Sequence, residues 1–189
     1  NDIGHISRFI ESAAQELREK EGVPLDAEGR IDMAAFAGVY SDVEKDQDIV
    51  RGWEKEWYPG QSEETIEETR KLSDGEKLEA LVHALFQKNL GGDFVVARAS
   101  RYDDIKNKVD NILLDRNTGN LGCAFDEVGD TTGRVYEEKK NKIFERNTKE
   151  HGARLKYGIT YENREDRKEI KLGAVDHLPI FYIALPQSH

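Results

Sequence analysis

The chain has 189 residues, 37% of them hydrophobic and 35% charged, and its formal net charge is −10 at pH 7. This length is sufficient for one domain with a hydrophobic core, no apolar run approaches the roughly 20 residues that span a bilayer, and the negative charge disfavours generic nucleic-acid binding. The single cysteine, Cys123, excludes a disulfide framework and a thiolate zinc site, so we expect a reducing, cytoplasmic location without membrane association.

The N-terminal part of the chain is predicted to be helical and acidic. Apolar residues at helical spacing predict a helix over 3–20 and a second one over 33–57, and a short acidic helix is expected over 62–71. Residues 1–80 carry 10 Lys/Arg against 21 Asp/Glu, a balance of −11. Residues 1–72 are therefore interpreted as an acidic helical extension.

The rest of the chain, residues 73–189, mixes helices with strands. Ser73 and Glu76 form a capping box that opens a helix to about residue 89. Two apolar runs, 109–114 and 121–128, flank a polar turn in which Gly119 and Asn120 accept positive φ, which predicts a β-hairpin. Three further strands, 93–100, 155–161 and 178–185, and a charged helix over 134–150 complete the pattern. Helices between strands of one sheet predict an α/β core with a mixed central sheet flanked by helices.

Each apolar run of the hairpin contains a carboxylate, Asp110 in the first and Asp126 in the second. Burial of an unpaired carboxylate costs on the order of several kcal/mol, so we expect these residues to have a function. Glu79 lies at the border of the apolar stripe of the preceding helix, where it can face the interior. Three converging carboxylates form an all-oxygen site that suits Mg²⁺ or Mn²⁺.

The order of these residues, Glu79 on a helix, Asp110 on a strand and Asp126 at the end of the next strand, followed by a basic helix, resembles the PD-(D/E)xK nuclease superfamily. The resemblance covers roughly residues 75–186 and implies a restriction-endonuclease-like fold. It also implies that these three residues are catalytic and bind Mg²⁺ or Mn²⁺. The protein would then hydrolyse phosphodiester bonds in nucleic acid as an endonuclease or exonuclease. DNA is favoured over RNA as the substrate.

The sequence departs from this family where the motif Lys is expected, because position 128 is Val128. A register shifted to Glu127 places Gly129 at that position, which also lacks an amine. Some members of the superfamily supply the Lys from the following helix. Lys139 or Lys142 would then be catalytic here, with solvated or phosphate-contacting roles as the alternative.

The predicted nucleic-acid contact is the basic zone 134–156, which carries 8 Lys/Arg against 4 Glu. A solvated helix face has the same composition and is the alternative interpretation. A second functional hypothesis is a catalytically inactive nuclease-fold domain that acts as a scaffold or binds a protein partner or a second copy; Val128 and the net charge favour it. Structural roles are also open: Asp110 paired with Lys108 or Arg98, Glu79 paired with His83, Asp126 at the start of a loop, and Asp103 and Asp104 in a turn.

Overall fold

A computed structural model describes residues 2–129, 131–164 and 167–184. The elements of the N-terminal half are mostly helical: α1 (Asp2–Glu21), the 3₁₀ helix η1 (Met33–Gly38), α2 (Val43–Trp57), α3 (Glu63–Leu72) and α4 (Asp74–Leu90). The elements that follow are β1 (Phe94–Arg98), α5 (Arg101–Asn107), β2 (Asn111–Asp115), β3 (Leu121–Val128), α6 (Gly133–Lys149), β4 (Ala153–Arg164), β5 (Arg167–Leu178) and β6 (Ile180–Ala184).

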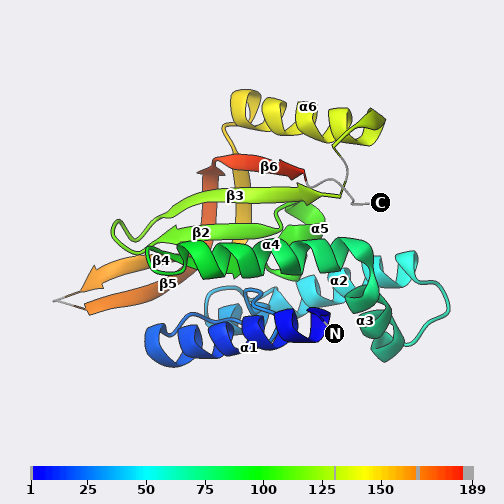
Figure 1. Cartoon of the computed structure of the whole chain (residues 1–189). Coiled ribbons are helices and arrows are strands. Elements are labelled where there is room, and N and C mark those ends of the chain that lie inside the picture. The colour runs from blue at the N-terminus through cyan, green and yellow to red at the C-terminus, as the bar shows by residue number, and fades with distance from the viewer. Residues whose placement is uncertain (1, 130, 165–166, 185–189) are drawn as a thin grey trace.

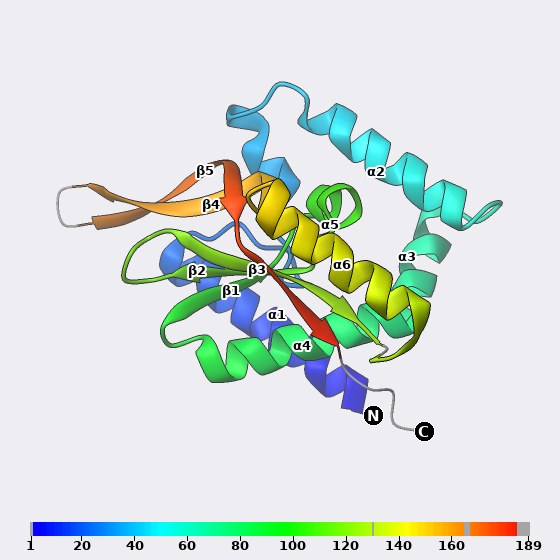
Figure 2. The same ribbon diagram turned by 90° about the horizontal axis from the view of Figure 1, so that it is seen from above.

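Within the described residues, four strands form a mixed sheet in the order β1-β2-β3-β6. The first three strands are antiparallel neighbours, and β6 pairs in parallel with β3. Helix α4 covers one face of the sheet with α1 beside it, whereas α5 and α6 lie on the opposite side (Figures 1 and 2). The predicted α/β architecture, a mixed sheet flanked by helices, is confirmed at this level.

The hairpin of β2 and β3 is confirmed, with Asn111 opposite Phe125 and a bulge between Leu113 and Leu114. The turn between the strands needs one residue with positive φ, and Gly119 supplies it at 78°. Asn120, for which positive φ was also expected, does not have it. The polar turn therefore determines the register that places Asp110 beside the end of β3.

Strands β4 and β5 form a separate antiparallel ribbon that projects from the domain (Figure 2). The sequence predicted a strand over 155–161 but no strand over 167–178, where charged and apolar residues are mixed. Asp103 of α5 anchors the ribbon, because its carboxylate accepts hydrogen bonds from the backbone N–H groups of Lys156 (2.8 Å) and Tyr157 (3.0 Å). Asp103 is fully buried and has a structural role here.

Two helical segments differ from the prediction. The single helix expected over 33–57 is interrupted after Gly38: η1 begins at the N-cap Asp32, and α2 starts only at Val43. The turn expected at Asp103 and Asp104 is instead the short helix α5, whose N-cap Ser100 accepts a hydrogen bond from the N–H of Asp103 at 3.1 Å. Short elements of this kind depend on caps more than on periodicity.

The N-terminal segment packs into the same hydrophobic core as the sheet. Buried side chains from both parts of the chain form one cluster, which includes Leu17, Phe36, Val95, Leu114 and Ile180. Arg30 forms a parallel bridge with Arg98 at the β1 edge of the sheet. In the described part of the chain, no helix combines the length and the apolar character that crossing a membrane requires.

Candidate metal centre

Three carboxylates from three elements meet beside the start of β2. Glu79 belongs to α4 and Asp104 to α5, and Asp110 is the residue immediately before β2. One carboxylate oxygen of each lies within 4.8 Å of the other two. The backbone of Asp110 is held between two strands, because its N–H donates to the carbonyl of Phe125 at 2.8 Å and its own carbonyl accepts from Ala99 at 2.9 Å. The predicted convergence of Glu79 and Asp110 is therefore observed, with Asp104 as an additional member.

Glu127 of β3 is a further buried carboxylate beside Asp110, outside the group of three whose oxygens lie within 4.8 Å of one another. The Oδ2 atom of Asp110 accepts a hydrogen bond from the backbone N–H of Glu127 at 2.6 Å. The Oε1 atom of Glu127 accepts from the Asn111 side chain at 2.9 Å, whereas its Oε2 atom is buried and has no hydrogen-bond donor among the described residues. A buried carboxylate oxygen without a donor is costly, so this atom requires either a proton on the carboxyl group or a cation beside it.

The electrostatics of Asp110 and Glu127 indicate a deficit of positive charge. Burial, reinforced by the neighbouring Glu127, raises the pKa of Asp110 well above its usual range. Burial, together with the nearby Glu79, raises the pKa of Glu127 to about 8. Neither carboxyl group has an ion pair with a basic side chain in the described part of the chain. A bound cation or a shared proton is needed to stabilise the pair.

A buried hydrogen-bonded chain orients Glu127. Asn111, fully buried on β2, donates its side-chain N–H to Glu127 and accepts from the Nδ1 atom of His83 of α4 at 2.9 Å through its own side-chain oxygen. Burial lowers the pKa of His83 to about 3, so the ring is neutral near pH 7. The Nδ1 atom carries the proton, because it faces the amide oxygen of Asn111. The pairing of His83 with Glu79, one of the structural alternatives, does not occur among the described residues.

Asp126 lies on the other face of β3, as side-chain alternation along a strand requires. Its Oδ1 atom accepts from the Nζ atom of Lys139 of α6 at 2.9 Å, and the same amine donates to the carbonyl of Glu127 at 3.1 Å. The metal-ligand group of Glu79 and Asp110 does not include Asp126 in the described part of the chain. Lys142 lies further along α6 and has no ion pair with a described residue. The amine next to the end of β3 is therefore that of Lys139.

Sequence reasoning missed two members of the centre, Asp104 and Glu127. The Ser100-to-Asp103 spacing is a capping signal that could have revealed helix α5 and thereby placed Asp104. For Glu127, alternation separates its face from that of Asp126, but the sequence does not say which face α4 covers. The contact between Phe86 of α4 and Phe125 of β3, with ring centroids 4.8 Å apart, shows that α4 covers the Glu127 face.

A network of four arginines borders the centre on one side: Arg30 and Arg98 are buried, and Arg70 and Arg101 are partly exposed. Arg30 contacts Asp104 and Glu79, both at 3.1 Å, and Arg98 contacts Glu79 at 2.7 Å. These contacts leave Asp110 and Glu127 without a basic partner. Arg98 therefore does not pair with Asp110, the other alternative that the sequence left open.

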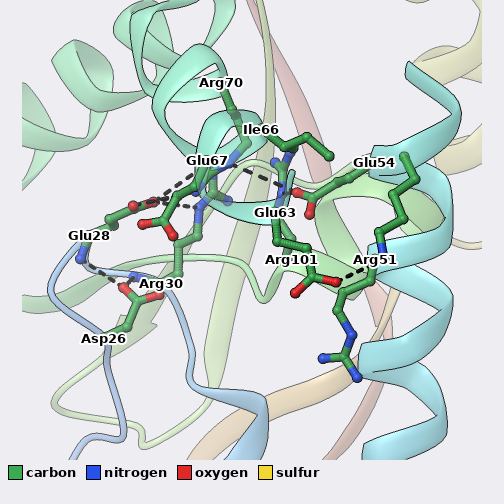
Figure 3. Close-up of a pocket in the computed structure, with 11 residues that line it drawn as sticks. Asp26, Glu28, Arg30, Arg51, Glu54, Glu63, Ile66, Glu67, Arg70 and Arg101 are labelled. Atoms are coloured by element: carbon green, nitrogen blue, oxygen red, sulfur yellow. Dashed lines mark hydrogen bonds and ion pairs between the residues drawn. The ribbon is translucent and has the colours of Figure 1, made fainter. Parts of the chain in front are cut away.

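The outer part of the arginine network faces a cavity of about 320 Å³ between α2, α3 and the loop that precedes Arg30 (Figure 3). Arg70 pairs there with Glu28 and Arg101 with Glu54. Although burial raises the pKa of Glu76 at the junction with the centre, the surrounding guanidinium groups, Arg30 first among them, hold it well below its usual range. Basic and acidic side chains balance around this cavity, so its lining does not select a charged ligand.

The carboxylate oxygens that lie within 4.8 Å of one another come from Glu79, Asp104 and Asp110, and Glu127 adds a buried carboxylate beside Asp110. Such a set suits Mg²⁺ or Mn²⁺ better than zinc or copper, which prefer imidazole or thiolate ligands. Comparison with protein-family models, curated proteins and solved structures finds no match for this chain.

Proposed function

We propose that this protein is a divalent-cation-dependent hydrolase of phosphodiester bonds in nucleic acid. The observation that carries the proposal is the buried Oε2 atom of Glu127, which lacks a donor among the described residues and belongs to a carboxylate beside Asp110. Glu79 and Asp104 supply further oxygens within reach of Asp110. Together these residues form a cage of carboxyl oxygens whose chemistry fits Mg²⁺ or Mn²⁺.

The roles of the residues follow from their positions. Asp110 and Glu127 would be the principal cation ligands, with Glu79 and Asp104 completing the cage. A divalent cation bound there would lower the pKa of a water molecule and stabilise negative charge on a phosphate. The Lys139 amine, which contacts the carbonyl of Glu127, would contact the phosphate or help to orient the attacking water.

A divergent PD-(D/E)xK relationship with a restriction-endonuclease-like fold is part of this proposal. It is supported by the chain order of the cluster: a helix Glu (Glu79), an Asp at the start of a strand (Asp110) and an acid on the next strand (Glu127). It is also supported by an amine from the following helix, since Val128 leaves the motif position without one. The strand acid in this proposal is Glu127, and Asp126 supports Lys139 instead.

A second candidate function is a catalytically inactive domain of the same shape that acts as a scaffold. The observation that favours it is the contact of Glu79 with both Arg30 and Arg98, because these guanidinium groups already neutralise part of the cluster. In this case the arginines would substitute for the cation, and the centre would contribute only to folding.

Cleavage assays distinguish the two functions. Plasmid DNA, single-stranded DNA and RNA are incubated with the protein and Mg²⁺ or Mn²⁺, and the products are separated on gels. Asp110→Asn and Glu127→Gln are expected to abolish cleavage, whereas Glu64→Gln, on an exposed site of α3, is expected to retain it. Cleavage that persists in Asp110→Asn would disprove the proposed centre. Cation binding to the wild type without cleavage of any substrate would support the scaffold function.

A further inference from the structure

A half-open cavity of about 340 Å³ lies between the C-terminal end of α5, the end of β3 and helix α6. Three exposed lysines line it: Lys106 and Lys108 from the end of α5, and Lys142 from α6. This cavity is distinct from the carboxylate cluster, although the same two elements contribute to both. Helix α5 provides Asp104 to the cluster, and β3 provides Glu127 to the cluster and Asp126 to the cavity.

The charges around this cavity do not balance. Its acidic side chains each have a basic partner already: Asp126 pairs with Lys139, Glu145 with Lys149, and Glu150 with Arg146. Lys106, Lys108 and Lys142 form no ion pair within the described residues. Three ammonium groups without an ion-pair partner among the described residues therefore meet at one cavity of a protein whose net charge is −10. They favour an anionic ligand with several charged groups.

The other basic residues of α6 are paired along their own helix. Arg134 contacts Glu138, Lys140 contacts Glu137, and Lys149 contacts Glu145. Of the broad basic zone expected over 134–156, the part on α6 that can bind an anion therefore consists mainly of the side chains that line the cavity. Helix α5, which the sequence did not implicate, adds two of the three unpaired lysines.

The backbone conformation of Lys108 also indicates a functional role for this surface. Lys108 adopts the left-handed conformation, with φ of 52° and ψ of 52°, at the C-cap of α5. Glycine is the usual residue at such a position, and strained conformations of larger residues concentrate at functional sites. Lys108 lies two residues before Asp110 in the chain, so one short segment connects this cavity with the carboxylate cluster.

We propose that this cavity binds the phosphate groups of a nucleic-acid strand through Lys106, Lys108 and Lys142, independently of any cation. The choice of nucleic acid as the ligand rests on the proposed function. The surface would hold the sugar–phosphate backbone by electrostatic contacts without reading the bases.

The test is the binding of a fluorescein-labelled single-stranded oligonucleotide, measured by anisotropy in EDTA over a range of salt concentrations. One variant combines Lys106→Ala, Lys108→Ala and Lys142→Ala. The matched control combines Lys45→Ala, Lys88→Ala and Lys171→Ala, which removes the same positive charge from exposed lysines on α2, α4 and β5. Circular dichroism and thermal unfolding verify that both proteins are folded.

The cavity variant is expected to lose about tenfold or more in affinity at low salt. The slope of log affinity against log salt is expected to decrease by about 0.7 for each phosphate contact removed. The control is expected to bind like the wild type, apart from a small uniform loss. Equal losses in the two variants, or wild-type affinity in the cavity variant, would overturn the proposal, as would absence of binding by the wild type. Strand binding in EDTA that is not followed by cleavage when excess Mg²⁺ or Mn²⁺ is added would contradict the proposed function alone.

Discussion

The carboxylate of Asp110 accepts a hydrogen bond from the backbone N–H of Glu127 at 2.6 Å, which brings two buried acidic side chains together at the end of a hairpin. Hydrogen-bond donors satisfy one oxygen of each group, and no described basic side chain pairs with either. In the absence of a cation, the pair is stabilised by retaining protons. This relationship links the stability of the fold, its dependence on pH and its affinity for cations.

The stability of the cation-free protein is predicted to fall as pH rises from about 5 to about 8. The folded pKa values of Asp110 and Glu127 are raised, so the folded state holds more protons than the unfolded state in this interval, and the free energy of unfolding decreases as pH increases. The slope reaches about 1.4 kcal/mol per pH unit for each proton concerned. Urea unfolding in EDTA at several pH values measures this slope of the free energy of unfolding against pH.

Glu127→Gln is predicted to remove most of this pH dependence and to raise stability at about pH 8. The new amide can still accept from Asn111, and its N–H can donate to the Asp110 carboxylate. Glu64→Gln on α3 serves as the control and should follow the wild-type curve. A wild-type stability that rises between these pH values would show that the two carboxyl groups do not retain protons in the fold.

Asn111→Ala is predicted to reduce both stability and cation affinity. It removes the donor to Glu127 Oε1 and the acceptor for His83, and leaving buried polar groups unsatisfied costs about 1–3 kcal/mol. Loss of a residue that orients a metal ligand lowers affinity by about 10–100-fold. Thermal unfolding and Mn²⁺ titration measure the two effects. Asn89→Ala, at an exposed position of α4, should change neither; an Asn111 variant with unchanged affinity would refute the orienting role.

Arg98→Met is predicted to destabilise the protein in EDTA by about 3–5 kcal/mol, because it leaves buried carboxylates without their partner. Mg²⁺ should restore part of this loss, since Glu79 then keeps Arg30 as its basic partner but no longer Arg98, and can contact a cation. Arg70→Met is the control: its partners Glu28, Glu54 and Glu76 lie outside the carboxylate cluster, so Mg²⁺ should not rescue it. Equal rescue of the two variants, or none of either, would exclude Glu79 from the cation site.

Lys108→Gly is predicted to separate stability from strand binding. Glycine adopts the left-handed conformation without the cost of about 1–2 kcal/mol that a larger residue incurs, so the variant should be at least as stable as the wild type. Its affinity for an oligonucleotide should nevertheless fall. Lys106→Gly, within α5, removes the same charge but should cost about 1 kcal/mol in stability. A Lys108→Gly protein that is less stable than Lys106→Gly would contradict this interpretation.

Local signals in the sequence were sufficient for much of the fold. The Ser73 cap located α4, because the backbone N–H of Glu76 donates to the Ser73 hydroxyl. The other half of the predicted capping box does not form, since the N–H of Ser73 donates to the carbonyl of Arg70 and the Glu76 carboxylate pairs with arginines. Apolar alternation around Gly119 located the hairpin. Glu79 and Asp110 could be selected because each is a carboxylate at the edge of, or within, an apolar pattern, and the structure brings these two together.

Contacts between distant parts of the chain account for what sequence reasoning did not find. Helix α5 depends on Asp103, whose buried carboxylate binds a strand about fifty residues later. The choice between Asp126 and Glu127 depends on which side of the sheet α4 packs, and a single sequence does not encode this in any local pattern. The ion pair between Arg30 and Glu79 joins residues 49 positions apart, so no periodic pattern in the sequence indicates it.

The central claim is that Glu127, together with Asp110, Glu79 and Asp104, forms a cation site on the α4 face of the sheet. Calorimetric titration of Mn²⁺ into the wild type, Glu127→Gln and Asp126→Asn at about pH 8, where Glu127 begins to release its proton, tests it most directly. Saturable binding is predicted for the wild type and for Asp126→Asn, and none for Glu127→Gln. Absence of binding to the wild type, or binding that is lost in Asp126→Asn but kept in Glu127→Gln, would contradict it.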